Sequence, residues 1–258
     1  YTFLRNSPYY GNLPPGYDKD TLEQKKNEVC SIFTNNIVAP ENTSLKEICE
    51  KFMYMYNYLN KINKSPKEDK TITDEDCHFM NYWLNVNLRD KNIDEEICVN
   101  DFYEKLKSKD TSIFSSTTKL EDHLHVIESG HLKNMQLLYE LYDTKQKITD
   151  IMFDEDVTVD KKELCQEHLE KCYHNYIEGM NNCLYGYDDF YEALKLFERD
   201  YKYLTEKVTN ESGYCKISEN LRLPENDLVL DEKQRRIMTT KIMSTPLILL
   251  FVIPLLYK

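Results

Sequence analysis

The chain's best candidate for metal chemistry is the stretch CQEHLEKCYH at residues 165–174. Cys165, His168 and Cys172 follow one another at i, i+3 and i+7, so on a helix they share one face. Thiolate and imidazole groups bind zinc, but structural zinc sites usually take ligands from a turn or knuckle. Cys165 and Cys172 cannot bridge each other, because two helical turns separate them by about 10 Å. The spacing favours disulfides to other elements, or core positions, over a metal site.

Three more histidines lie close together in HLHVIESGH: His123, His125 and His131. A zinc site needs side chains that converge on one point. Residues two apart on a helix, such as His123 and His125, point in different directions. Exposed helix histidines are therefore favoured over a second metal site.

Acidic runs at residues 74–76, 94–96 and 153–156 offer carboxylates that could act as general acids or bases. No run has convergent partners in sequence, and the first two lie at expected helix starts, where the helix dipole favours acids. Phosphate-loop, dinucleotide-binding, nucleophile-elbow and zinc-protease motifs are all absent from the sequence. We therefore predict no catalytic residue, no cofactor and no small-molecule substrate, and we expect the protein not to be an enzyme.

The elements that must position these residues are predicted to be helices. The 258 residues include only 6 Gly and 8 Pro, which disfavours turn-rich sandwiches and barrels. TLEQ at 21–24 and SLKE at 44–47 match the capping box that opens a helix. Apolar residues then recur at three-and-four spacing. That spacing predicts helices over residues 21–36, 45–62, 74–88, 93–108, 118–147 with a break or kink at Gly130, 156–184 with Asp160 as cap, and 187–208. Residues 1–20 are predicted to be extended, and the Ser/Thr-rich residues 109–119 are predicted to be a linker.

The segment DEDCHFMNYWLNVNL, residues 74–88, carries the chain's one tryptophan, Trp83. Its apolar residues form two stripes on a helix. The first stripe is Cys77, Met80, Leu84 and Leu88, and the second is Phe79, Trp83 and Val86. A helix with two apolar sides is expected to lie between other helices.

Eight cysteines are spread along the chain without a Cys-x-x-Cys pair. An even, dispersed set favours disulfides in an oxidising compartment, and the alternative is buried free thiols in a cytosolic protein. The disulfide candidates, whose pairing the spacing leaves open, are Cys30, Cys49, Cys77, Cys98, Cys165, Cys172, Cys183 and Cys215.

The C-terminal residues 246–257 carry no charge and are nearly all apolar. This run is shorter than the roughly 17–25 residues of a spanning helix, so a buried helix, an interfacial segment and a membrane anchor are all considered. The anchor is favoured because the run has no polar face to meet water. We predict a juxtamembrane segment at residues 226–241 and a transmembrane segment, truncated, at residues 242–258. The latter includes Pro246, Leu250, Phe251, Pro254 and Leu256.

The net charge of −12 argues against nucleic acid as a partner, because phosphate contacts need a basic face. Membrane lipid is the partner expected for the C-terminal segment. Together these observations predict an all-α fold, an irregular disulfide-linked helical bundle with a C-terminal membrane segment.

Three stretches resemble the Plasmodium interspersed repeat (PIR/VIR) variant antigens. CHFMNYWLNVNL at residues 77–88 is similar to the family's Cys-x-x-Leu-Asn-Tyr-Trp-Leu element, with Met80 in place of the usual Leu. LCQEHLEKCYHNYIEGMNNC, followed by FYEALKLFERDY, resembles the later Cys-rich helical part. TPLILLFVIPLLYK resembles the start of the family's C-terminal membrane segment.

The resemblance implies a disulfide-held helical ectodomain over residues 21–225, in which Trp83, Tyr82 and Leu84 anchor the core and Cys77 staples their helix. It implies a membrane location, at the surface of a malaria-infected red blood cell or in parasite-derived host-cell membranes. The implied function is immune evasion and adhesion, with a host-cell surface protein or an antibody as partner. The family has no known catalytic residues. The alternative is an exported structural or trafficking protein inside the infected host cell.

Overall fold

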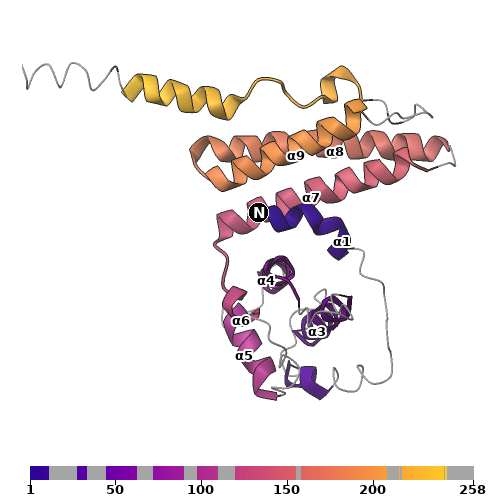
Figure 1. Ribbon diagram of the computed structural model, residues 1–258, viewed down its shortest axis with the longest axis vertical. Helices are drawn as coiled ribbons and strands as arrows, with labels where there is room; N and C mark the ends of the chain where they lie inside the picture. Colours follow the sequence, from indigo (N-terminus) through magenta and orange to yellow (C-terminus); the bar gives the residue numbers. More distant parts are fainter. Residues whose placement is uncertain are drawn as a thin grey trace, which may run out of the picture. The chain divides into compact units, whose positions relative to one another are not determined.

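A computed structural model describes residues 1–11, 28–33, 45–62, 72–89, 98–109, 120–154, 158–207, 215, 217–240 and 242. Over these ranges the chain is all-helical and has no strand, which confirms the predicted all-α class (Figure 1). The chain divides into two compact units, Tyr1–Asp143 and Thr144–Lys258. Each unit has its own buried core.

The first unit is built from short N-terminal helices and longer ones that follow. Its elements are η1 (Thr2–Asn6), α1 (Ser7–Gly11), η2 (Ser31–Phe33), α3 (Leu45–Ile62), α4 (Asp74–Arg89), α5 (Val99–Lys109), α6 (Leu120–His123) and the first part of α7 (Ser129–Met152). The predicted helices at 45–62 and 74–88 are confirmed. The helix predicted from residue 93 is described only from Val99, because residues 90–97 lie outside the described ranges.

The core of the first unit follows the apolar spacing of the sequence. Leu45, Ile48, Phe52, Tyr56 and Leu59 of α3 are all fully buried. The helix α4 contacts α3, α5, α6 and η1, as expected of a helix with more than one apolar side.

The prediction of an extended N-terminus is wrong for residues 2–11, which are helical. Phe3, Leu4 and Tyr10 are buried, and the Tyr10 ring stacks on Phe79 of α4 with ring centres 4.1 Å apart. The Tyr10 hydroxyl donates to Asp76 at 2.8 Å. Burial of these side chains against α4 offsets the turn-prone composition of the segment.

The second unit pairs two long helices. Its elements are the remainder of α7, α8 (Val159–Asn182), η3 (Cys183–Tyr185), α9 (Asp188–Lys207), η4 (Glu219–Leu221) and a helix at residues 228–240, which we call the stem helix. Figure 1 shows α8 and α9 side by side, and the two helices are in contact. Both carry buried residues at i, i+4, i+7 and i+11, which form the seam between them. These are Cys165, Leu169, Cys172 and Tyr176 on α8 and Phe190, Leu194, Phe197 and Tyr201 on α9.

Two helix boundaries differ from the prediction. The break in the helix expected over 118–147 falls at residues 124–128, and Gly130 lies in the first turn of α7. The cap of α8 is Thr158, not Asp160, because Thr158 has an extended backbone and its hydroxyl accepts from Lys161 N at 3.4 Å. Asp160 instead lies in the first turn, where an acidic side chain interacts well with the helix dipole.

Among the described helices, none combines the length and apolar character needed to cross a membrane. Ile242 is helical and exposed, but the other residues predicted to lie in the membrane fall outside the described ranges. Those are Pro246, Leu250, Phe251, Pro254 and Leu256.

Candidate functional site

The cysteines divide equally between disulfides and thiols. Cys30 joins Cys49, and Cys165 joins Cys215, each pair with Cα atoms 5.7 Å apart. Four candidates remain thiols: Cys77, Cys98, Cys172 and Cys183. The structure therefore agrees with the disulfide prediction for only half of the set.

The expectation that Cys77 staples its helix is wrong. Cys77 is a buried thiol on α4, and burial raises its pKa to about 12. Burial likewise raises the pKa of the Cys172 and Cys183 thiols to about 12. A thiol with so high a pKa is a poor nucleophile and a poor metal ligand at neutral pH, so these three side chains act as small apolar core residues.

The residues weighed for metal binding are held in other interactions. Cys165 is bonded to Cys215, so it cannot join His168 and Cys172 as a thiolate ligand. The Tyr1 hydroxyl lies 2.8 Å from His131 Nδ1, while His123 lies 3.5 Å from Asp74. Within the described ranges, no group of three or more His, Cys, Asp or Glu side chains is arranged to hold a metal ion.

Two buried asparagines on α4, Asn81 and Asn85, bind the backbone of the non-helical residues 124–128. Asn81 Oδ1 accepts from His125 N at 3.0 Å, and Asn85 Nδ2 donates to His125 O at 2.9 Å. Asn85 Oδ1 also accepts from Ile127 N at 2.9 Å. The two side chains lie one helical turn apart and are linked by an Asn85 Nδ2 to Asn81 Oδ1 bond of 3.1 Å. This asparagine pair therefore supplies the hydrogen bonds that residues 125–127 lack outside a helix.

The burial of α4 can be compared with the core anchors predicted for it. Leu84 and Tyr82 are buried, as predicted for core anchors. Trp83 is partly buried, with its ring centre 6.5 Å from that of the fully buried Phe52, so it lies at the edge of the core. The deepest face of α4 carries Asn81 and Asn85 among apolar residues, and a pattern of apolar residues alone cannot locate a face that is partly polar.

The second unit contains a cluster of charged and hydroxyl groups around Glu198, which is buried between α8 and α9. Glu198 accepts from Tyr176 at 2.8 Å and from Lys202 at 2.6 Å, and it pairs with Lys195. Burial alone would raise the pKa of Glu198, but the hydrogen bonds from Lys195, Lys202 and Tyr176 outweigh it and the pKa is lowered. Glu198 is therefore a stabilised carboxylate at neutral pH, not a general acid.

Asp227 extends this cluster to the start of the stem helix. Its Oδ2 accepts from Tyr191 at 2.7 Å and lies 3.1 Å from Lys195 Nζ, while its Oδ1 accepts from Leu230 N at 3.1 Å. Asp227 is thus the cap of the stem helix and a partner of α9 at once. Six residues after Asp227, Lys233 bonds Asp188 at 2.6 Å and lies over the Tyr191 ring. The contacts fasten the first turns of the stem helix to α9.

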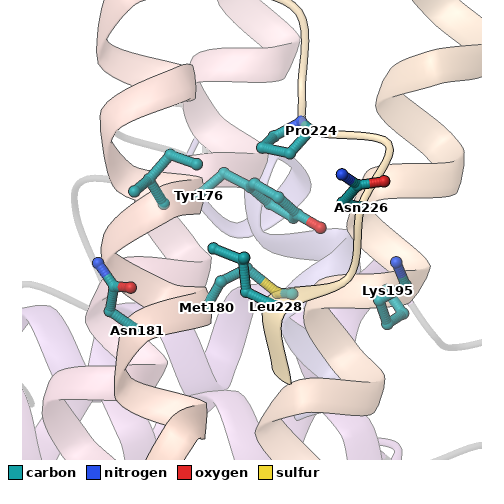
Figure 2. A pocket seen from close by; sticks show the side chains of 8 residues that line it. Tyr176, Met180, Asn181, Lys195, Pro224, Asn226 and Leu228 are labelled. Atoms are coloured by element: carbon teal, nitrogen blue, oxygen red, sulfur yellow. The ribbon is translucent and has the colours of Figure 1, made fainter. Parts of the chain in front are cut away.

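A small hollow lies beside this cluster (Figure 2). It is lined in part by Tyr176 and Met180 of α8, Lys195 of α9, and Asn226 and Leu228 before and within the stem helix. The hollow leaves about 20 Å³ for the centre of a water-sized sphere, which is room for one or two water molecules. Small-molecule sites usually offer roughly 300–1,000 Å³, so this hollow suits solvent and not a cofactor or substrate.

No protein-family model matches the chain, and the comparisons with curated proteins and with solved structures found no similar protein. The functional argument therefore rests on the residues themselves. The asparagine pair and the Glu198 cluster both join elements to one another, and neither presents an exposed reactive group.

The sequence carried signals for both sites that apolar periodicity does not use. Asn81 and Asn85 are spaced i, i+4, and Lys195, Glu198 and Lys202 are spaced i, i+3, i+7. Each spacing places the side chains on one helix face. The partners in residues 124–128 and at Asp227 lie far along the chain, so spacing alone does not reveal them.

Proposed function

We propose that the chain is the helical, membrane-anchored part of a PIR/VIR-like variant surface antigen of malaria-infected red blood cells. In this proposal it is displayed on the cell surface, where it serves immune evasion and contacts a host-cell surface protein or an antibody. Residues 242–258 anchor it in lipid. It has no catalytic role.

The observation that carries the proposal is the place of the Asn81–Leu84 element in α4. This element is the most specific piece of the family resemblance, and three of its four residues, Asn81, Tyr82 and Leu84, are buried. Asn81 takes part in binding the backbone of His125. An element shared across a variable family is expected to build the scaffold, because core changes cost several kcal/mol whereas surface changes usually cost less than about 0.5 kcal/mol.

Two further features support the proposal: the disulfides bear on the compartment, and exposed apolar side chains bear on partner binding. The disulfides Cys30–Cys49 and Cys165–Cys215 belong to different units, so each unit has one covalent link. Disulfides persist in oxidising environments and are rare in the cytosol. The chain also places exposed aromatic and apolar side chains, such as Tyr9 and Val126, on the surface of the first unit, where a protein partner could bind them.

The four cysteines that remain thiols favour the second candidate, an exported structural or trafficking protein inside the host cell. Free, buried cysteines are ordinary in proteins of a reducing compartment. This candidate does not require either unit to be displayed on the cell surface.

Protease treatment of infected cells separates the two candidates. Cells that express the chain with an epitope tag before Tyr1 are treated with trypsin, either intact or after permeabilisation, and the tagged band is followed by immunoblot. Surface display predicts loss of the full-length band in intact cells. Protection in intact cells, with cleavage only after permeabilisation, would reject display and support the internal role.

A further inference from the structure

The stem helix is held at its beginning and exposed beyond it. Val229 is 1% exposed, and Lys233 bonds Asp188 of α9. Residues 234–240 are all exposed, including Ile237 at 55% and Met238 at 62%. The helix therefore keeps its shape over a stretch in which apolar side chains face outward.

These apolar side chains gather on one side of the stem helix. At 3.6 residues per turn, Leu230, Ile237 and Met238 fall within an arc of about 100°. Gln234 and Lys241 fall within the same arc, and the exposed Leu228 and Ile242 lie outside it. Asp231, Glu232, Lys233, Arg235 and Arg236 lie outside that arc. Glu232 pairs with Arg236 at 3.1 Å and with Arg235 at 3.5 Å, so the polar side is nearly neutral overall. A helix with an apolar side and an Arg-containing polar side suits the boundary between water and lipid.

We propose that the stem helix lies in the interfacial layer of the bilayer, with Leu230, Ile237 and Met238 turned toward the acyl chains. The inference rests on the proposed membrane anchor and adds a second lipid contact to it. Three residues lie between Ile242 and Pro246, the first residue of the uncharged run, so the two Cα atoms are at most about 14 Å apart. The end of the stem helix must therefore stay near the point where that run enters lipid. Arg235, about 60° beyond Met238 around the helix, can reach lipid phosphates from the flank.

A second copy of the chain fits this side of the helix less well. A paired helix would need apolar residues at alternating three and four spacings. Between Leu230 and Ile237 that spacing falls on Gln234, and after Ile237 it falls on Lys241. Pairing would bury the Gln234 amide and the Lys241 ammonium group between two helices, whereas at the bilayer boundary the Lys241 side chain can extend to the headgroups.

The test measures lipid contact at two positions of the full chain reconstituted in phosphatidylcholine vesicles. Met238→Trp places a tryptophan on the apolar side, and Thr240→Trp places one two residues away, outside the arc and about 200° around the helix from position 238. Both variants keep Trp83, whose signal in the parent chain is subtracted. Quenching is measured with phosphatidylcholine brominated near the top of the acyl chains, and co-sedimentation with vesicles is measured in parallel.

We expect roughly twofold stronger bromine quenching at position 238 than at 240, because an interfacial helix buries its apolar side about 5–10 Å deep. Equal, weak quenching at both positions in a chain that co-sediments would overturn the inference and leave the anchor standing. Unquenched Met238→Trp emission with a dimer detected by cross-linking would assign the apolar side to a second copy. Failure to co-sediment would reject both the anchor and the inference.

Discussion

Replacing Asn85 by alanine tests whether the asparagine pair holds the first unit together. Asn85→Ala removes the bonds to His125 O and Ile127 N, both 2.9 Å long. Ile127 is buried, so its N–H is left without a partner, and each such group costs about 1–3 kcal/mol. We expect a total loss of about 3 kcal/mol in the free energy of unfolding.

The matched control is Asn87→Ala on the same helix. Asn87 Nδ2 donates only to Trp83 O, four residues earlier, at 2.8 Å. That carbonyl lies in the helix interior, and alanine is the better helix former, so we expect a change below about 0.5 kcal/mol.

Urea unfolding followed by Trp83 fluorescence measures both variants. Trp83 is the chain's one tryptophan and lies on α4 between Asn81 and Asn85, so its fluorescence reports on the first unit. With a slope near 2 kcal/mol/M, Asn85→Ala should lower the urea midpoint by about 1.5 M relative to the parent chain. The midpoint of Asn87→Ala should stay nearly the same as that of the parent chain. Equal midpoints for the two variants would refute the assignment of the asparagine pair.

Other perturbations have equally definite expectations. Trp83→Ala should destabilise the first unit by less than Leu84→Ala, whose fully buried side chain should cost about 2–5 kcal/mol in urea unfolding. Cys165→Ser should cost about 4 kcal/mol and Cys30→Ser about 3 kcal/mol, because the disulfides close loops with sequence separations of 50 and 19; the reverse order in thermal unfolding would contradict the entropic argument. Because the folded pKa of Glu198 lies below its ordinary value of 4.5, its contribution is full above that pH and is lost as the pH falls below it. Glu198→Gln should therefore flatten the acid limb of unfolding followed by circular dichroism. An unchanged limb would show that the Glu198 carboxylate does not govern acid unfolding.

The helices that were predictable from sequence are those whose apolar residues recur at regular three-and-four spacing. In α3, the three-and-four spacing of Leu45, Ile48 and Phe52 corresponds directly to full burial. The seam of α8 and α9 follows the same rule from Cys165 to Tyr176 and from Phe190 to Tyr201. Local periodicity is enough here because each residue's environment is set by its position around one helix.

The features that sequence did not predict depend on partners far along the chain. Residues 2–11 are helical where turn-rich composition suggests an extended segment, since Phe3 and Tyr10 pack on α4. Asn81 and Asn85 are buried because residues 125–127 need hydrogen-bond partners, about forty residues later. The pairing of the cysteines likewise depends on contacts that spacing cannot give.

Peptide mapping of the unreduced chain, isolated from its native source and with its thiols blocked by an alkylating agent in denaturant, tests the central claim of a covalently tied helical fold most directly. We predict two linked peptide pairs, Cys30 with Cys49 and Cys165 with Cys215. Alkylation in denaturant is expected at the remaining four cysteines, because unfolding exposes the three buried thiols. A map with all eight cysteines alkylated would contradict both the cross-links and the oxidising compartment.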